Sequence, residues 1–369
     1  MDYNTLYSRL VRLYSVMPRI AFRGYAFPPL QLFIELTRRC NLRCVMCQNQ
    51  PYVAHVSVTS EKEKELTLEE LDRIVSQTSW FTVITLTGGE PLLRKDFRDI
   101  LTCISSKRRC HVITNGVLLD KDMAQLMVKS APRNLFSRGL LFVGISMHGP
   151  AEVHDRITQL DGSFALATDG ARYLAESKAS ANSKFPVVYL GAVLTKDTVE
   201  TLPEMVSIAR EVSALIFNVV LHNTSLDLSI LRGATMETMG QQPVPPERIE
   251  PEHLRAKLSE TLRRGAELGV QVRLPRMPIS EIVNYYAGKW QPSGYTCYTP
   301  WSKTYVSPYG QVYACHQYEV GNLREKPLKN IWNNAQYRRF RLALKQRDVF
   351  PICAACCEIE CSSRVSPLP

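Results

Sequence analysis

Short runs of consecutive apolar residues recur through the first two thirds of the chain, and stretches with a helical spacing of apolar residues lie between them. Six such runs occupy residues 32–36, 81–87, 110–114, 140–146, 185–194 and 213–221. Since parallel strands that are covered on both faces are apolar throughout, these runs are typical of buried parallel strands. The pattern predicts an α/β fold, a partial (βα)6 barrel, with its chemistry at the carboxyl ends of the strands.

The helices between these strands carry their own signals. Thr67 followed by Glu70 forms a capping box ahead of an apolar stripe, which predicts a helix start. Phe97, Leu101 and Ile104 repeat at helical spacing after the second strand, which predicts a second amphipathic helix.

The pattern divides the chain into four parts. Residues 1–29 hold a basic amphipathic helix, 30–222 the barrel, 223–290 a proline-rich linker followed by a helix over about 251–268, and 291–369 a cysteine-rich module. Basic amphipathic helices can lie on membranes, but most pack on their own domain, so we expect no peripheral membrane contact.

Composition adds charge and compartment. The formal net charge is +10, which favours an anionic or polar partner. A cytoplasmic protein is expected, because the sequence has neither an apolar run of about 18 residues nor a secretion signal. A nucleic-acid-binding scaffold is an alternative of another class, but no compact basic run with interleaved aromatics supports it, so no nucleic acid is expected.

The eleven cysteines cluster at short spacing. In a chain without a secretion signal, such clusters indicate metal ligation rather than disulfides. Two of them, Cys103 and Cys110, instead lie on a predicted helix and strand and are expected to be buried structural residues.

The first cluster follows the first strand with the spacing C-x3-C-x2-C, formed by Cys40, Cys44 and Cys47. Zinc sites usually gather four ligands, whereas a cubane iron–sulfur cluster held by three thiolates leaves one iron open to a small molecule. On the residues alone, a zinc site, a redox pair and a cluster site all remain possible.

A second motif follows the second strand. Gly88 and Gly89 allow a close backbone approach, and Glu90 can accept hydrogen bonds from an ammonium group. Together, C-x3-C-x2-C after strand one and GGEP after strand two resemble the radical S-adenosylmethionine family over about residues 30–222.

The resemblance implies a four-iron cluster on the three cysteines, with S-adenosylmethionine chelating the open iron. The GGE residues would hold the methionine end of this cofactor. By the same resemblance, further cofactor contacts are expected at residues on the cluster loop, at the ends of later strands and in the next helix: Met46, Asn115, Ser146, His148 and Arg156.

The C-terminal module contains Cys297 and Cys315, then C-x2-C-C-x3-C at residues 353–361. Spacing alone allows structural zinc equally well. The context "SPYGQVYAC", "GNL" and "IW" resembles SPASM and twitch extensions, which implies one auxiliary four-iron cluster and less readily a second. The expected ligands are Cys297, Cys315, Cys353 and Cys356, with Cys361 as substitute and Cys357 as a free neighbour.

These features predict an enzyme that cleaves S-adenosylmethionine reductively to a 5′-deoxyadenosyl radical and abstracts hydrogen from a polar or anionic small molecule, such as a sugar, nucleotide or natural-product intermediate. A closed auxiliary cluster would then handle an electron. The alternative is a SPASM-type peptide maturase, which the short segment before the first strand disfavours. A flavodoxin- or ferredoxin-type electron donor is the expected partner, and the unranked candidates for a general base are His148, His222 and Arg273.

Overall fold

The computed structural model describes residues 3–49, 64–224, 234–316 and 318–361. Ten strands form one sheet in the order β11-β10-β9-β1-β2-β3-β4-β5-β6-β7. The barrel strands are β1 (Gln31–Glu35), β2 (Val83–Thr87), β3 (Arg109–Thr114), β4 (Gly139–Ser146), β5 (Val187–Leu194), β6 (Ile216–Leu221) and β7 (Gln271–Arg273). Each pairs in parallel with the next, so the predicted α/β fold with a parallel sheet is confirmed.

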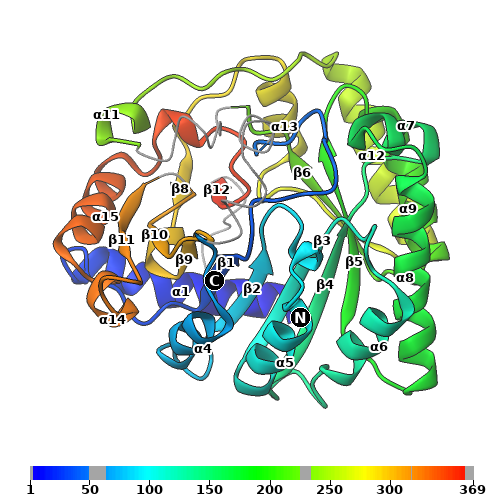
Figure 1. Cartoon of the computed structure of the whole chain (residues 1–369). Helices are drawn as coiled ribbons and strands as arrows, with labels where there is room; N and C mark the ends of the chain where they lie inside the picture. The colour runs from blue at the N-terminus through cyan, green and yellow to red at the C-terminus, as the bar shows by residue number, and fades with distance from the viewer. Residues whose placement is uncertain (1–2, 50–63, 225–233, 317, 362–369) are drawn as a thin grey trace.

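Helices cover the outer face of this curved sheet (Figure 1). They are α4 (Leu68–Ser76), α5 (Phe97–Lys107), α6 (Lys121–Lys129), α8 (Ser163–Ser180), α9 (Leu202–Glu211) and α12 (Pro251–Leu268). Two further helices, α7 (Ala151–Thr158) and α13 (Ile279–Tyr286), lie at the carboxyl end of the barrel (Figure 1). The predicted capping box is present at the start of α4, where the Thr67 side chain accepts from the Glu70 backbone. The predicted stripe on α5 is buried in the core, as Phe97, Leu101 and Ile104 show.

The C-terminal elements extend the barrel sheet from its other edge. Strands β9 (Lys303–Val306), β10 (Gln311–Tyr313) and β11 (Glu319–Asn322) continue it beyond β1, and β9 pairs with β1 in parallel. A separate pair joins β8 (Tyr295–Cys297) to β12 (Ile359–Cys361). Short helices η3 (Thr299–Trp301), α14 (Leu328–Ile331) and η4 (Pro351–Cys353), the longer α15 (Ala335–Arg347), and α11 (Met236–Met239) from the preceding segment complete this region.

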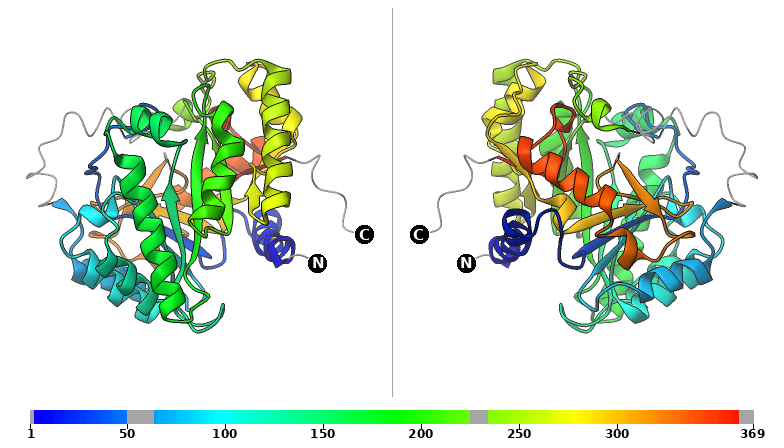
Figure 2. Two further views of the ribbon diagram at one scale, coloured as in Figure 1. Left: turned by 90° about the vertical axis from the view of Figure 1, so that its right-hand side faces the viewer. Right: turned by 90° about the vertical axis from the view of Figure 1, so that its left-hand side faces the viewer.

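The N-terminal helix α1 (Tyr3–Ala21) packs beside these C-terminal elements, as Figures 1 and 2 show. Arg19 forms an ion pair with Asp348, and its guanidinium lies 5.9 Å from the ring centroid of Trp301. Arg12 lies 4.0 Å from a carboxylate oxygen of Glu360. The helix therefore joins the two ends of the described chain. In the part of the chain that the structure describes, no helix is long and apolar enough to pass through a lipid bilayer.

Candidate functional site

The loop after β1 carries the first three cysteines at the carboxyl end of the barrel. The Cys47 N–H donates to the Cys44 carbonyl at 3.0 Å, and the Leu42 N–H donates to Cys40 Sγ at 3.5 Å. Burial, with a further contribution from the neighbouring thiols, raises the pKa of Cys40 to about 11 and that of Cys44 to about 12. The loop thus carries three thiols whose thiolate forms need an adjacent positive charge, which iron would supply. Among the described residues, no three Cys, His, Asp or Glu side chains lie close enough together to hold a single metal ion, so the chemistry of the donor set points to a multi-iron group. The donor set fits an iron–sulfur cluster.

Gly88 and Gly89 hold the next loop against this one. The Gly89 N–H donates to the Thr37 carbonyl at 2.7 Å, and a Cβ at Gly89 would lie 2.2 Å from the carbonyl oxygen of Arg39. Gly88 has a φ of +147°, and a Cβ there would lie 2.3 Å from the Thr37 carbonyl oxygen. The sequence predicts that these glycines let a ligand approach closely. In the structure, the segment that approaches them closely is the backbone of the cysteine loop.

Glu90 is locked inside the protein. Its side chain has 0% exposure, and its carboxylate accepts from the Thr114 hydroxyl at 2.8 Å, the Leu92 N–H at 2.9 Å and the Asn115 N–H at 2.7 Å. Burial raises its pKa to about 7 despite these hydrogen bonds. The Glu90 carboxylate therefore ties the GGEP loop to the end of β3 rather than projecting into open space.

Asn115 completes the connection to the cysteine loop. Its side-chain Nδ2 donates to Asn41 Oδ1 at 2.9 Å and lies 3.9 Å from Cys40 Sγ, while its Oδ1 accepts from the Val117 N–H at 3.0 Å. The ends of β1, β2 and β3 are thus joined by one chain of contacts from Cys40 through Asn115 to Glu90.

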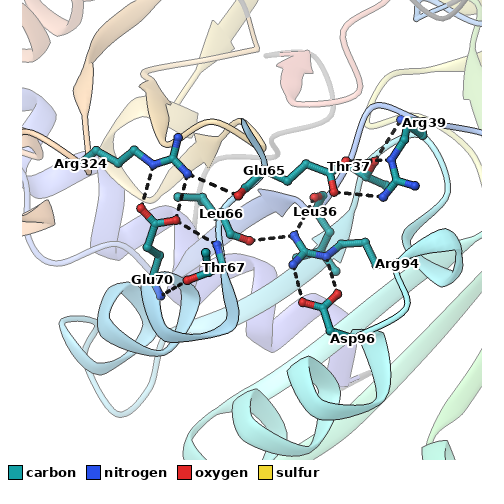
Figure 3. A network of polar contacts seen from close by, with 10 residues as sticks. All are labelled: Leu36, Thr37, Arg39, Glu65, Leu66, Thr67, Glu70, Arg94, Asp96 and Arg324. Atoms are coloured by element: carbon teal, nitrogen blue, oxygen red, sulfur yellow. Dashed lines mark hydrogen bonds and ion pairs between the residues drawn. The ribbon is translucent and has the colours of Figure 1, made fainter. Parts of the chain in front are cut away.

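A polar network fixes the base of the cysteine loop from the other side (Figure 3). The Arg39 guanidinium donates twice to the Glu65 carboxylate, at 3.0 Å each, and the Thr37 hydroxyl also bonds to Glu65. Arg94, from the segment after GGEP, donates to the carbonyls of Leu36 at 3.2 Å and Leu66 at 2.8 Å. Sequence reasoning missed this network, because Glu65 lies far from the cysteines along the chain.

The network continues to the C-terminal elements. Arg324 forms two hydrogen bonds with the Glu70 carboxylate, at 2.7 and 2.9 Å, and donates to the Glu65 carbonyl. Both residues are partly exposed, so the pair itself contributes little to stability, but it joins the segment before α4 to the region after β11.

The remaining predicted cofactor residues divide into two groups. Ser146 ends β4 and His148 follows it, both at the carboxyl end of the barrel, and Met46 is half-buried on the cysteine loop. Arg156 lies apart from them: its side chain is 61% exposed and faces Asp197 at 3.7 Å. The structure does not bring Arg156 into the group.

The three candidate bases differ in what they can do. His148 Nδ1 accepts from the Val193 N–H at 3.4 Å, which places the proton of the neutral ring on Nε2. Burial, with the neighbouring His154, lowers the His148 pKa to about 3, so its ring is neutral and donates at Nε2. Burial also lowers the pKa of His222, which follows β6. Arg273 bonds to Gln271, and a guanidinium stays protonated and cannot act as a base.

A hydrogen-bond chain that sequence analysis did not find crosses the barrel lumen. Gln31 Nε2 donates to Thr85 Oγ1 at 2.8 Å, Thr85 Oγ1 lies 3.4 Å from His111 Nδ1, and His111 Nε2 lies 3.0 Å from the Tyr189 hydroxyl. These residues come from β1, β2, β3 and β5. The alternation of polar Arg109 and His111 with apolar Cys110 and Val112 was the available signal in the sequence, but it does not tell which inward residues meet.

Four C-terminal cysteines line one cavity together with apolar residues from α15, η4 and β12: they are Cys297, Cys315, Cys353 and Cys356. These are the expected auxiliary ligands, and four thiols around one cavity fit an iron–sulfur cluster. Burial and the nearby thiols raise the pKa of Cys353 well above its ordinary value.

Two further cysteines lie outside this lining set. Cys361, the expected substitute ligand, sits on β12 opposite Tyr295, and it is not among the residues that line the cavity. Cys357 is exposed and contacts Cys356. Elsewhere, Cys110 is fully buried as expected, but Cys103 is only partly buried, and its thiol contacts the Asp72 carboxylate at 2.9 Å.

Aromatic contacts connect the barrel lumen to this cavity. The ring of Phe33 on β1 stacks on Tyr305 of β9 at 4.8 Å, and the Tyr305 ring lies 4.0 Å from that of His316. Tyr305 and His316 both line the cavity, as does Glu358, whose carboxylate is paired with Lys303. Phe33 on the first barrel strand is thereby connected through Tyr305 to the cavity of the C-terminal cysteines.

Two family models match separate parts of this chain. The model of the Radical SAM superfamily matches residues 34–209, and the model of SPASM, an iron-sulfur cluster-binding domain, matches residues 297–357.

Among curated relatives, the PqqA peptide cyclase of Granulibacter bethesdensis is 26% identical over 327 residues, which cover 85% of this chain and 76% of that protein. The Fe-coproporphyrin III synthase of Methanosarcina barkeri is 30% identical over 180 residues, which cover 48% of this chain and only 40% of that protein. Among solved structures, SuiB of Streptococcus suis bound to S-adenosylmethionine shares the fold with a TM-score of 0.62 at 16% identity, covering 92% of this chain and 74% of that one.

Proposed function

Since this chain belongs to the radical S-adenosylmethionine superfamily and carries a SPASM iron–sulfur cluster-binding domain, we propose that it is a peptide maturase that oxidises a residue of a peptide substrate. Its cofactors are S-adenosylmethionine, a four-iron cluster and auxiliary iron–sulfur chemistry.

The similarity to peptide cyclases carries this proposal. It extends over 85% of the chain and so includes both the barrel and the SPASM domain. A structure of SuiB with the precursor peptide SuiA has the same fold, at a TM-score of 0.60. These relatives support a peptide better than the small molecule that the sequence suggested.

The chain's own residues have distinct tasks in this proposal. Cys40, Cys44 and Cys47 hold the four-iron cluster, and Asn115 and Glu90 keep the adjoining loops in place. When bound, the cofactors would provide the chemistry that removes a hydrogen atom from an unactivated carbon of the substrate and accepts the electron that remains on the substrate radical.

The histidines at the carboxyl end of the barrel act on the peptide. The Nε2–H of His148 donates to a peptide carbonyl and orients it. His222, whose pKa is lowered by burial, is neutral at pH 7 and accepts the proton that the oxidised substrate loses. Loss of a hydrogen atom, an electron and a proton amounts to a two-electron oxidation, with either a new bond or a double bond in the product.

The experiment uses full-length protein reconstituted anaerobically with iron and sulfide. Incubation with dithionite, S-adenosylmethionine and a library of translated peptides should yield peptides lighter by two hydrogen atoms, together with 5′-deoxyadenosine. Cys44→Ala protein is the matched control and should yield neither. About eight irons per chain are expected if each site holds a four-iron cluster.

A porphyrin precursor serves as a second substrate in the same assay, because the 180-residue similarity to Fe-coproporphyrin III synthase, an enzyme named for its product, favours such a precursor as the next candidate. Turnover of the porphyrin precursor with an unmodified peptide library would overturn the proposal. Turnover of a peptide alone would support it.

A further inference from the structure

Much of the face of the barrel opposite the cysteine loop is formed by the loops that precede strands β2 to β6. They occupy residues 77–82, 108, 130–138, 181–186 and 212–215 and lie at the lower end of the barrel in Figure 1. We call them, with the last three residues of the helices that lead into them and the first residue of β3, the amino-terminal face.

This face is strongly basic. Its single carboxylate is Glu211, against nine basic residues: Lys107, Arg108, Arg109, Lys129, Arg133, Arg138, Lys178, Lys184 and Arg210. The excess of basic over acidic residues on this face accounts for most of the net charge of +10 of the whole chain. A concentration of one sign of charge on one face attracts a partner of the opposite sign.

The charges are largely unneutralised within the protein. Lys107 pairs with Asp72, but Arg108 donates to the Thr78 carbonyl and hydroxyl and Arg109 to the carbonyls of Phe81 and Leu135. Burial, and then the like charge of Arg138, lowers the pKa of Arg108. Among the described residues, no other basic side chain of this face forms an ion pair with a carboxylate. An external anion would relieve this repulsion.

Large apolar side chains stand between these charges. Phe136 is 82% exposed, Trp80 75% and Leu215 52%, and each comes from a different loop. Trp80 packs edge-on against Phe81, whose ring lies 6.4 Å from that of Tyr14 on α1. Helix α1 in turn exposes Leu13, Met17 and Ile20. Tryptophan and phenylalanine beside lysine and arginine are typical of surfaces that enter the headgroup region of a bilayer.

We propose that the amino-terminal face docks on an anionic lipid bilayer. Single aromatic tips on separate loops, surrounded by basic residues, suit insertion between headgroups better than burial against one acidic protein. An electron donor is a poor occupant, since barrel strands of 5–8 residues hold this face roughly 17–26 Å from the cysteine loop. This proposal departs from the expectation of no peripheral membrane contact, which the sequence raised only for the N-terminal helix, because the residues that form this face are far apart along the chain.

Vesicle flotation tests the proposal with reconstituted full-length protein. The protein should float with vesicles of phosphatidylcholine and phosphatidylglycerol but not with phosphatidylcholine alone, and rising salt should release it. Arg133→Glu with Arg138→Glu should weaken binding by about tenfold or more. Trp80→Ser with Phe136→Ser should also weaken it and abolish a blue shift of tryptophan fluorescence on binding.

The matched control reverses two exposed charges at the opposite end of the barrel, Lys95→Glu with Lys121→Glu, and should float like the unmodified protein. Iron content and circular dichroism establish that each variant folds. If the unmodified protein does not float with anionic vesicles, the proposal is overturned, and this result is the one expected if the partner is an acidic protein. An equal loss of vesicle binding in the control variant would also overturn the proposal.

Discussion

Tyr189 lies directly across Gly144 in the barrel lumen. A Cβ at position 144 would lie 2.2 Å from Tyr189 Cζ and 2.3 Å from its hydroxyl oxygen. The two residues face each other in the β4–β5 register, and the missing side chain on β4 lets the tyrosine reach His111 on β3. The hydrogen-bond chain across the lumen thus depends on one glycine.

Gly144→Ala should therefore displace Tyr189 and lower the free energy of unfolding by about 1–3 kcal/mol, as overpacking of a filled interior does. In a Tyr189→Ala background the same substitution should cost much less, because the added methyl group then enters free space. Urea unfolding of the four proteins measures this coupling. Additive effects of the two substitutions would contradict the geometry described here.

Glu90→Gln should destabilise the protein by about 1–3 kcal/mol at acidic pH, because an amide group would face the Asn115 N–H donor without accepting from it. Burial raises the folded pKa of Glu90 to about 7, above its unfolded value, so its favourable contribution is complete at low pH and is lost as pH rises through 7. The loss is about 3 kcal/mol.

The difference in stability between the unmodified protein and the Glu90→Gln variant should consequently shrink between pH 4.5 and pH 8. Urea unfolding of the cluster-free proteins across this range is the measurement. A difference that stays constant or widens with pH would show that Glu90 is ionised throughout.

Glu65→Ala should loosen the cysteine loop, because Arg39 and Thr37 would lose their common acceptor. Iron bound after reconstitution should fall from about eight to about four per chain, with the SPASM site still filled. Glu70→Ala is the control: it removes the pair with Arg324 in the same network but leaves the Arg39 contacts intact, and its iron content should stay unchanged. Equal iron loss in both variants would indicate general unfolding.

Cys356→Ser should reduce reconstituted iron to about four per chain, since Cys356 lines the auxiliary cavity. Cys361→Ser should retain about eight, because Cys361 lies on β12 outside the lining residues. Iron analysis with electron paramagnetic resonance of the reduced proteins separates the two sites. Retention of iron in Cys356→Ser together with loss in Cys361→Ser would reverse the ligand assignment.

The barrel was predictable from the sequence because each strand lies in a short, mostly apolar run and because local signals, such as the Thr67–Glu70 capping box, report directly on their own segment. The cysteine spacing and GGEP likewise indicated the chemistry of the loop ends. These features depend on residues that are near one another in sequence.

What could not be predicted depends on contacts between distant segments. The β7 and β9 additions to the sheet are strands of three and four residues with no distinct pattern, and their place is set by pairing with β6 and β1. Glu90 gives no sign in the sequence that its carboxylate will meet the end of β3. The space over Gly144 is visible only once β4 and β5 are aligned.

The pairing of β9 with β1 makes the two iron–sulfur regions a single mechanical unit. The strand whose end carries Cys40 is held on one side by β2 and on the other by a strand of the SPASM domain, so any hinge between the regions would have to break backbone hydrogen bonds. The path between the two cluster sites is therefore set by the sheet rather than by domain closure. Removing the C-terminal region would turn β1 into an open edge, exposed to pairing with other chains, so we expect neither half to serve as an independent unit.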